Sequence, residues 1–322
     1  MRAAQVSVLD GPQAVAVVDL PEPVATPDQV VIDVRAAGVN FPDVLLTRGQ
    51  YQIRPDLPFV PGSEVAGVVR QAPPGSGFRA GDRVCAFSGL GAFAEVAVAA
   101  PSATFALPGS LSFTAAAALP MNYFTVHFAL LRRGRLQAGE TVLVHGAAGG
   151  IGTAATQLAT AHGARVVAVV SSEAKAAVAR QAGADEVVPS DGFRAAVAEA
   201  TQGRGVDVVV DPVGGDRLTD SLRSLAPEGR HLVIGFTEGS IPEVRVNRLL
   251  LNNLDVVGVG WGAFWLGHPG YLQQQWAELR PQVESGLLAP VIGATMNLEA
   301  AAAAIGVLDR REAVGKVVLE VA

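Results

Sequence analysis

The pattern of hydrophobic and polar positions changes near residue 120. Before that point, short runs rich in valine recur, and each is bounded by glycine, proline or other turn residues. The clearest of these runs are QVVIDVRAAGV, EVAGVVRQA, DRVCAF and AEVAVAA. Apolar runs of this length between turn residues predict short strands, so we expect a β-rich unit with small loops.

Between about residues 123 and 260 the pattern alternates between buried strands and amphipathic helices. Continuous runs of valine, leucine and isoleucine are followed each time by a helix-like segment with one apolar face. The strand-like runs are TVLV, ARVVAVV, ADEVV, VDVVVD, RHLVIGF and LDVVGVG. This alternation is typical of a parallel sheet covered on both faces. Right-handed crossovers then predict a doubly wound α/β fold.

The last sixty residues predict a helix at YLQQQWAELRPQVESG, a short strand at PVIG, a helix at NLEAAAAAIGVL and a final strand at GKVVLEV. We expect that final strand to return to the first unit. The predicted organisation is therefore a discontinuous domain formed by 1–122 and 262–322, with a second domain inserted at 123–261.

Composition excludes several classes of function. Of the 322 residues, half are hydrophobic and 17% are charged, with a formal net charge of −6 and no run of basic residues, so a nucleic-acid partner is disfavoured. Cys85 is the single cysteine, which excludes an internal disulfide and fits a reducing compartment. The opening MRAAQVSVLDG does not read as a secretory signal, and no apolar run is long enough to span a membrane. We expect a cytoplasmic protein.

The stretch HGAAGGIG, residues 145–152, lies between the strand-like TVLV and a helix-like segment. It matches the dinucleotide fingerprint G-x-G-x-x-G except that Ala147 replaces the first glycine. Gly149 would let a pyrophosphate approach the backbone, and Gly152 would allow close packing of helix on strand. The alternative is a glycine-rich turn that binds nothing. His145 is interpreted as structural or as close to a phosphate.

The residues after the second strand of this domain choose between the nicotinamide cofactors. An NAD site places a carboxylate there, whereas this chain has Ser171 and Ser172, with Lys175 one helical turn later. Two hydroxyls and an ammonium suit a ribose 2′-phosphate. Glu173 is expected to lie in the first turn of the next helix, where it suits the helix dipole. We therefore predict NADPH, although Lys175 could instead be an ordinary solvated lysine.

The segment 36–69, AAGVNFPDVLLTRGQYQIRPDLPFVPGSEVAGVV, resembles the medium-chain dehydrogenase/reductase superfamily in its zinc-free NADPH:quinone oxidoreductase branch, which includes zeta-crystallin. The resemblance extends over the whole chain through HGAAGGIG, DPVGG at 211–215 and the terminal GKVVL. It implies a GroES-like catalytic domain, a Rossmann domain and an active site in the cleft between them. The partition derived from the pattern agrees with it.

Zinc-dependent members of the superfamily bind catalytic zinc with a cysteine and a histidine, and this chain has Asn40 and Ser63 at those positions. Neither side chain replaces a thiolate or an imidazole in a tight zinc site. We therefore expect no metal, and an acceptor that is already electrophilic.

By resemblance, Asn40 and Asp43 lie near the nicotinamide and the floor of the active site, and Tyr51 lines the substrate cleft. Tyr51 could donate a hydrogen bond or a proton to a developing oxyanion. A second tyrosine common in the family is Leu45 here, which puts a mechanism with two tyrosines in doubt. The simpler alternatives are a helix cap for Asp43 and a packing aromatic for Tyr51.

The resemblance also implies a set of cofactor contacts outside the two serines and Lys175. In the glycine-rich turn they are Ala148, Gly149, Gly150 and Ile151, and elsewhere they are Thr125, Val213, Phe236, Gly260 and Trp261. The segment LNNLDVVGVGWG reads as an apolar edge strand, and pairing of two such edges predicts a homodimer.

These observations predict a zinc-independent enzyme that passes a hydride from NADPH to a quinone or another conjugated carbonyl. Two alternatives stay open. One is an enoyl-thioester reductase of the acryloyl-CoA type, with Arg48, Arg54 and Tyr51 at the acceptor. The other is a non-catalytic NADPH-binding protein.

Overall fold

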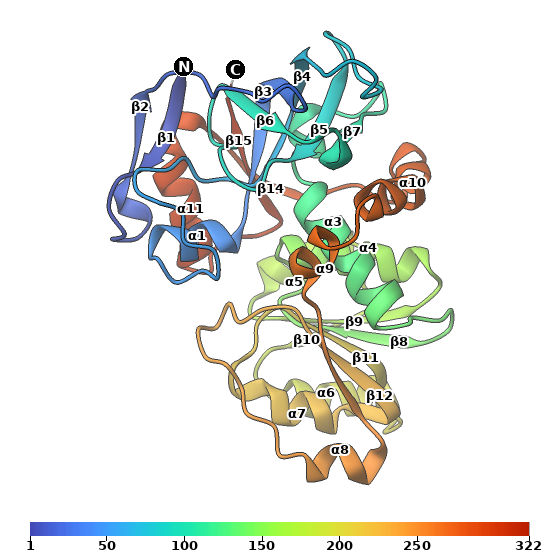
Figure 1. Ribbon diagram of the computed structural model, residues 1–322. Helices are drawn as coiled ribbons and strands as arrows, with labels where there is room; N and C mark the ends of the chain where they lie inside the picture. Colours follow the sequence, from blue (N-terminus) through green and yellow to red (C-terminus); the bar gives the residue numbers. More distant parts are fainter. Residues whose placement is uncertain (322) are drawn as a thin grey trace. The chain divides into compact units, whose positions relative to one another are not determined.

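The computed structural model describes residues 1–321, which divide into two compact units. Unit 1 comprises Met1–Met121, Pro269–Glu284 and Ile292–Ala322, of which the last residue is not described, and unit 2 comprises Asn122–His268 and Ser285–Val291 (Figure 1). Residues 262–268 and 285–291, expected in the first domain, lie in unit 2. Local contacts explain this placement, since the rings of Phe264 and Phe128 pack in a tilted arrangement with centroids 5.0 Å apart and Gln157 donates to the Ala289 carbonyl.

Unit 1 is built mainly from antiparallel strands. Its strands are β1 (Arg2–Val6), β2 (Val15–Asp19), β3 (Val30–Val39), β4 (Glu64–Gln71), β5 (Arg83–Phe87), β6 (Val96–Ala99), β7 (Thr104–Ala106), β14 (Ile292–Asn297) and β15 (Lys316–Glu320). Its helices are α1 (Phe41–Thr47), α2 (Phe113–Ala116), α10 (Tyr271–Glu284) and α11 (Ala301–Asp309), with 3₁₀ turns η1 (Pro12–Ala14), η2 (Pro101–Ala103) and η5 (Leu298–Ala300).

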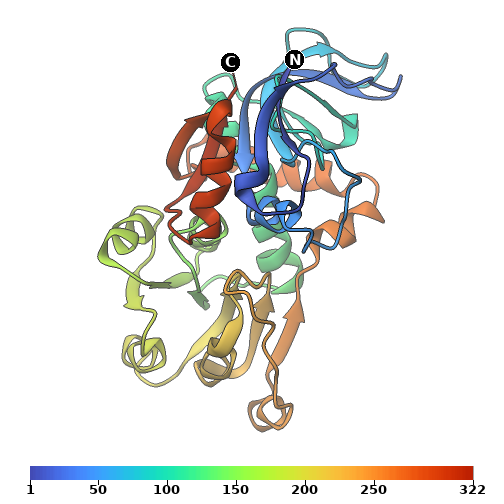
Figure 2. The same ribbon diagram turned by 90° about the vertical axis from the view of Figure 1, so that its left-hand side faces the viewer.

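The C-terminal strand returns to the N-terminal part of the chain, as the sequence predicts. The main sheet of unit 1 has the order β14-β15-β3-β4-β5-β7, with β6 paired to β3. β15 pairs antiparallel with β3, so that Val317 lies opposite Val39. Figure 2 shows α11 and β15, in red, beside the blue N-terminal strands. One apolar core, which includes Ile32, Val65 and Leu319, joins both ends of the chain.

Unit 2 contains the predicted parallel sheet. Its strands are β8 (Thr141–Val144), β9 (Arg165–Val170), β10 (Glu186–Pro189), β11 (Val206–Asp211), β12 (Leu225–Val233) and β13 (Asp255–Gly258). Its helices are α3 (Pro120–His127, whose first two residues belong to unit 1), the π-helix η3 (Phe128–Arg133), α4 (Gly150–Ala161), α5 (Glu173–Gln181), α6 (Phe193–Ala200), the 3₁₀ turn η4 (Gly215–Arg217), α7 (Leu218–Arg223), α8 (Asn247–Asn252) and α9 (Trp261–Leu266).

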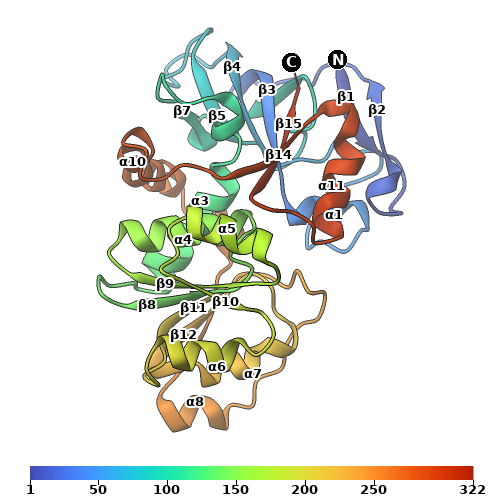
Figure 3. The same ribbon diagram turned by 180° about the vertical axis from the view of Figure 1, so that it is seen from behind.

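Within the described residues, the sheet of unit 2 has the order β10-β9-β8-β11-β12-β13, and every neighbouring pair is parallel. α4 and α5 cover one face, and α6 and α7 cover the other (Figure 3). The strand order reverses between β8 and β11, and open α/β sheets bind ligands at such a reversal. The predicted doubly wound fold is confirmed, and β13 is an edge strand, as expected.

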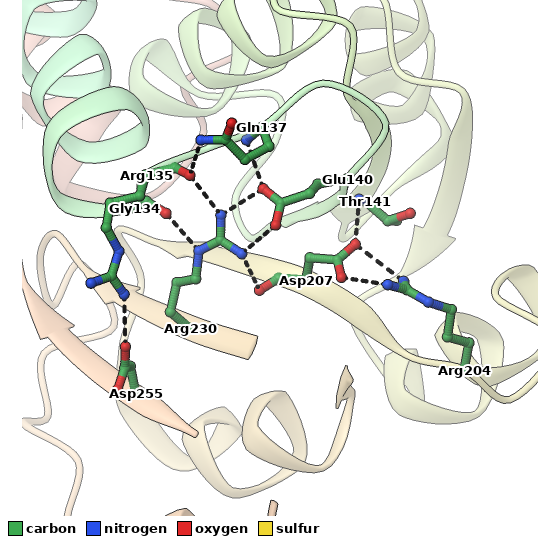
Figure 4. Close-up of polar contacts among 9 residues, drawn as sticks. All are labelled: Gly134, Arg135, Gln137, Glu140, Thr141, Arg204, Asp207, Arg230 and Asp255. Carbon is green, nitrogen blue, oxygen red and sulfur yellow. Dashed lines mark hydrogen bonds and ion pairs between the residues drawn. The ribbon is translucent and has the colours of Figure 1, made fainter. Parts of the chain in front are cut away.

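A buried arginine links neighbouring strands near their amino-terminal ends (Figure 4). Arg230 in β12 donates to the Gly134 carbonyl and forms two hydrogen bonds of 2.6 Å with the Glu140 carboxylate, just before β8. Asp207 in β11 accepts from the Thr141 N–H at 2.8 Å and pairs with Arg204 at 2.6 Å. These bonds fix the starts of β8 and β11 and the middle of β12 relative to one another, away from the carboxyl ends of the strands.

Candidate functional site

The glycine-rich turn follows β8 and leads directly into α4. All of β8 is buried, and the Gly149 N–H donates to the Gly146 carbonyl at 3.0 Å. A Cβ added at Gly152 would lie 2.2 Å from the Gly146 oxygen and 2.5 Å from the Ala147 Cα. Because both are backbone atoms, Gly152 is required for the close contact of helix and turn.

Gly149 has a different environment. A Cβ added there would meet only the Gly146 oxygen, at 3.4 Å, so packing inside the protein does not demand glycine. Gly149 is the N-cap residue of α4 and brings no side chain to the helix start, where the first N–H groups lack partners within the helix. The predicted contacts Ala148, Gly149, Gly150 and Ile151 are consecutive across this start. The arrangement fits a pyrophosphate bound by backbone N–H groups.

Asn122 lies against the same helix start and was missed by the sequence reasoning. Its amide nitrogen would be 2.5 Å from a Cβ added at Gly150, and the residue is 5% exposed. Asn122 lies in α3, 28 positions before Gly150, and no pattern in the sequence links the two. A glycine at 150 therefore makes room for a polar side chain of the protein.

The end of β9 gathers the groups predicted for a 2′-phosphate. The Lys175 ammonium donates to the Ser171 hydroxyl at 3.3 Å, and the Ser172 hydroxyl accepts from the Lys175 backbone N–H as the cap of α5. The carboxylate of Glu173 forms an ion pair with Arg180 of the same helix at 2.7 Å. Both serines are exposed, and this edge presents a cation with hydroxyls.

Val213 and Phe236 are brought together beside the glycine-rich turn. A Cβ added at Gly146 would lie 3.1 Å from Val213 Cγ2, and one at Gly214 would lie 2.8 Å from the Phe236 ring. The Glu238 N–H donates to the Val213 carbonyl at 2.9 Å. The loops after β11 and β12 therefore form one surface next to the turn.

Thr125 and Trp261 belong to neighbouring aromatic elements of unit 2. Trp261 is 4% exposed at the start of α9, just after Gly260, and its ring centroid lies 6.3 Å from that of Phe124 in α3. Thr125 is the next residue in α3 and is also buried. The indole thus packs inside unit 2, and any contact of residues 260–261 with a cofactor would use their backbone or the edge of the ring.

Unit 1 contains a buried cluster of charged and polar side chains. The Lys316 ammonium lies 2.5 Å from Glu64 Oε1 and 2.6 Å from Asn40 Oδ1. The Asn40 amide donates to Glu64 Oε1 at 2.8 Å, and the second Glu64 oxygen accepts from the Met121 N–H. The side chain of Asn40 is therefore committed to this cluster, which leaves one lone pair of its oxygen for other partners.

Asp43 caps α1 in a capping box. Its two oxygens accept from the N–H groups of Asn40, at 2.8 Å, and Gly62, at 3.1 Å. Burial raises the pKa of this carboxyl to about 7, although both N–H groups and the charge of Lys316 act in the opposite direction. Asp43 is thus a structural cap that also exchanges a proton near neutral pH.

Tyr51 follows α1 and is half-buried against the core of unit 1. Burial raises the pKa of its phenol, and the nearby charge of Asp43 raises it further. The phenol therefore keeps its proton at neutral pH and acts as a hydrogen-bond donor.

The sequence reasoning did not single out Glu64 or Lys316, although a signal was present. Each is the single charged residue at the start of an otherwise apolar run, EVAGVV and KVVL. A charge at such a position in a strand buried on both faces needs a partner, and the two runs supply opposite charges. Register between β15, β3 and β4 brings them together.

None of the helices within residues 1–321 is both long and apolar enough to cross a membrane. No group of three or more histidine, cysteine, aspartate or glutamate side chains among these residues is arranged to hold a metal ion.

Comparison with known proteins identified relatives along the whole chain. The family model "Alcohol dehydrogenase GroES-like domain" matches residues 26–109, and "Zinc-binding dehydrogenase" matches residues 150–284. The chain is 38% identical to quinone oxidoreductase-like protein 2 of Rattus norvegicus, over 99% of this chain and 91% of the relative.

Two solved structures are similar over nearly their full length. A probable oxidoreductase from Mycobacterium abscessus is 47% identical with a TM-score of 0.91, covering 99% of this chain and 98% of the other. The quinone oxidoreductase of Escherichia coli, solved in complex with NADPH, is 29% identical with a TM-score of 0.91 and covers 99% and 100%.

Proposed function

Because the chain belongs to the quinone oxidoreductase family of the medium-chain dehydrogenase/reductase superfamily, we propose that it reduces a quinone or another conjugated carbonyl without zinc. It is an NADPH-dependent oxidoreductase, and three similar structures were solved in complex with NADPH.

The observation that carries the proposal is the group formed by Lys175 with Ser171 at the end of β9. A 2′-phosphate distinguishes NADPH from NADH, and an ammonium with hydroxyl donors binds it, whereas a carboxylate would repel it. The carboxylate that follows these serines in the sequence, that of Glu173, pairs with Arg180. In this assignment the start of α4 binds the pyrophosphate and Lys175 binds the 2′-phosphate.

NADPH, when bound, supplies a hydride and leaves as NADP⁺. The protein orients the cofactor and delivers the proton that completes reduction of the acceptor. Hydride addition to a conjugated carbonyl or quinone places negative charge on oxygen, and the Tyr51 phenol is the donor we assign to that oxygen. Its raised pKa keeps the proton on the phenol until the charge develops.

The side chains at the two family positions for catalytic zinc support independence from zinc. Asn40 is hydrogen-bonded to both Lys316 and Glu64, and a neutral amide is a poor zinc ligand. Ser63 is 7% exposed, and its hydroxyl has no hydrogen-bond partner among the described residues. Without a Lewis acid the acceptor itself must be electrophilic, which favours quinones and enones over simple ketones.

The enoyl-thioester alternative needs cations for the phosphates of coenzyme A. Arg48, one of its two candidates, pairs with Asp309 at 2.7 Å. That ion pair occupies the guanidinium and leaves Arg54 as the remaining candidate. No contact in the structure favours a thioester over a quinone.

The test is a panel of acceptors with NADPH as the donor. Oxidation of NADPH is followed at 340 nm with 1,4-benzoquinone, 9,10-phenanthrenequinone and acryloyl-CoA, in the unmodified protein and in Tyr51→Phe. We expect turnover of the quinones, unaffected by a zinc chelator, and a loss of about 100-fold in kcat for Tyr51→Phe.

Three results would contradict the proposal. Activity on acryloyl-CoA alone would indicate the thioester reductase. NADPH binding without turnover of any acceptor would indicate a non-catalytic protein. Stoichiometric zinc in the purified protein, with activity lost on chelation, would refute independence from zinc.

A further inference from the structure

We propose that Asp211 is a positioning residue for the cofactor, because its carboxylate fixes the loop 212–215 against the glycine-rich turn. The inference rests on the proposed use of NADPH and assigns part of that binding to a side chain that does not reach the cofactor. The carboxylate is almost fully buried at the carboxyl end of β11, 2% exposed.

One oxygen of Asp211 holds the loop. Asp211 Oδ1 accepts from the Val213 N–H at 2.8 Å and from the Gly214 N–H at 2.9 Å. Two N–H groups converging on one anionic oxygen form charge-assisted bonds, which are stronger than neutral ones. The start of the loop therefore depends on a single carboxylate oxygen.

The loop in turn contacts the phosphate-binding turn. The Val213 side chain packs closely on Gly146: a Cβ added at Gly146 would lie only 3.1 Å from Val213 Cγ2. On its other side the Val213 carbonyl accepts from Glu238, in the loop after β12. A shift of Val213 would therefore move the surface beside Gly146 and the segment that carries Phe236.

The second oxygen of Asp211 faces a buried histidine. His231 Nε2 lies 3.2 Å from Asp211 Oδ2, and the histidine is 0% exposed. His231 lies opposite Val209 in the β11–β12 register. Val209 and Asp211 point to the same face of the sheet, since side chains alternate along a strand. The pairing of β11 with β12 therefore places the His231 imidazole next to the Asp211 carboxylate.

His145, at the start of the glycine-rich turn, is a second histidine near the Asp211 carboxylate, and it stays neutral. The Ser221 hydroxyl donates its one proton to the Arg217 carbonyl at 2.9 Å, so it must accept from His145 Nε2, 2.8 Å away. The Nδ1 of His145 then carries a lone pair. Burial lowers the pKa of His145 to about 4, so the neutral imidazole brings no positive charge to Asp211, and the hydrogen bonds to this carboxylate come from the two loop N–H groups.

An asparagine cannot reproduce this arrangement. A carboxylate accepts on both oxygens, whereas an amide has one accepting oxygen and one donating nitrogen. Asparagine at 211 can accept from the two loop N–H groups only when its nitrogen faces His231, and it lacks the charge in both orientations. Asp211→Asn therefore changes the hydrogen bonding with almost no change in shape.

The same strand offers a matched control at its other end. Asp207 is also a buried carboxylate, 9% exposed, and it also accepts a backbone N–H, that of Thr141 (Figure 4). Its side-chain hydrogen bonds are to Arg204 and to the start of β8, and none of them reaches the loop after β11 among the described residues. Asp207→Asn disturbs the sheet without disturbing Val213.

The experiment compares the two variants by NADPH titration calorimetry, thermal unfolding and hydrogen exchange of the segment 209–217. We expect Asp211→Asn to raise the NADPH Kd about tenfold or more and to speed exchange of the Val213 and Gly214 amides. We expect Asp207→Asn to lower Tm and to leave the Kd within about twofold. The exchange measurement needs no cofactor, so it tests the role of Asp211 even if the unmodified protein does not bind NADPH.

Several outcomes would overturn the inference. Unchanged exchange of the two amides in Asp211→Asn would show that the carboxylate does not hold the loop. Faster exchange with an unchanged Kd would show that the loop does not position NADPH. An equal loss of affinity in Asp207→Asn would assign the effect to general destabilisation. If Asp211→Asn does not fold, hydrogen exchange of the unmodified protein provides the test: the Val213 and Gly214 amides that donate to Asp211 Oδ1 should exchange slowly, and rapid exchange of both refutes the role.

Discussion

The ammonium of Lys316 lies 2.5 Å from a carboxylate oxygen of Glu64, and the two side chains are 4% and 0% exposed. Lys316 belongs to the last strand of the chain and Glu64 to β4, on either side of β3. Since Asn40 bridges the pair, this ion pair fixes the start of α1, and with it Asp43. The C-terminal strand therefore takes part in shaping the candidate acceptor site.

Removing one member of this pair should be costly. Lys316→Met leaves the Glu64 carboxylate buried without its cation, and we expect a loss of about 3–5 kcal/mol in the free energy of unfolding. Urea denaturation measures it. The double variant Lys316→Met with Glu64→Gln removes both charges and should recover part of the loss. A loss of less than about 1 kcal/mol in the single variant would show that the pair is not needed for folding.

The two glycines of the turn should separate folding from binding. A Cβ at Gly152 meets backbone at 2.2 Å, whereas one at Gly149 meets only the Gly146 oxygen, at 3.4 Å. We expect Gly152→Ala to cost about 3 kcal/mol or more of stability. Gly149→Ala should keep Tm close to that of the unmodified protein but lower the affinity for NADPH about tenfold, because the added methyl group crowds the pyrophosphate. Unchanged NADPH affinity in Gly149→Ala would argue against a pyrophosphate at this turn.

Lys175 should decide the preference between the two nicotinamide cofactors. We expect NADPH to bind more than about tenfold tighter than NADH. Lys175→Ala should remove most of that difference, because it lowers the affinity for NADPH and leaves the affinity for NADH unchanged. Calorimetry with both cofactors measures it. Arg180→Ala is the control, since this cation lies on the same helix and pairs with Glu173. Equal affinities for the two cofactors in the unmodified protein would refute the 2′-phosphate assignment.

His145 should make the protein sensitive to mild acid. Burial lowers the pKa of His145 from 6.5 to about 4, so the unfolded chain takes up a proton in this range that the folded chain does not. Its contribution to stability is therefore lost as the pH falls from about 6.5 to about 4, by up to about 3 kcal/mol. The raised pKa of Asp43 acts with the opposite sign in the same range.

A variant that does not titrate isolates this contribution. His145→Gln keeps a donor for Ser221, and Asp43 is present in both proteins, so the difference in unfolding free energy between them reports His145 alone. Relative to the unmodified protein, we expect the variant to gain stability as the pH falls from 7.5 to 4.5. A difference that does not change with pH would contradict the neutral, buried imidazole.

The edge of the parallel sheet should form a dimer. β13 is an edge strand in which Val256 is 36% exposed, and Leu250 and Leu251 of the neighbouring α8 are 78% and 75% exposed. We expect two copies to pair through this edge, because it would otherwise leave apolar side chains and backbone groups in water. Light scattering should find a dimer that Leu250→Glu with Leu251→Glu converts to a monomer. Leu287→Glu, at an exposed leucine elsewhere in the chain, should have no effect, and an unmodified protein that is already monomeric would contradict the prediction.

Much of the fold could be predicted from local patterns. The alternation of valine-rich runs with amphipathic segments predicted the parallel sheet, and HGAAGGIG predicted the turn into α4, because both signals lie within a few consecutive residues. The placement of 262–268 and 285–291 differed from expectation, since aromatic contacts such as that of Phe264 with Phe128 depend on which helices meet.

The candidate site was less predictable where it depends on distant partners. Asp43 was recognised as a candidate and as a possible cap, and the structure places it in a capping box. Its pKa near 7, however, results from complete burial. Asp211 was noted only as part of DPVGG, because nothing local shows that its partners are its own loop and His231.

By itself, the sequence determined the order of strands and helices, the glycine-rich turn and the pair of serines directly after β9, since backbone preferences and the identity of side chains are local properties. Only the tertiary structure decided which charges meet. Lys316 and Asn40 are 276 positions apart, and His231 reaches Asp211 through the register of β11 with β12. Such pairs form because strand pairing brings distant segments to one place, where burial then makes each charge depend on its partner.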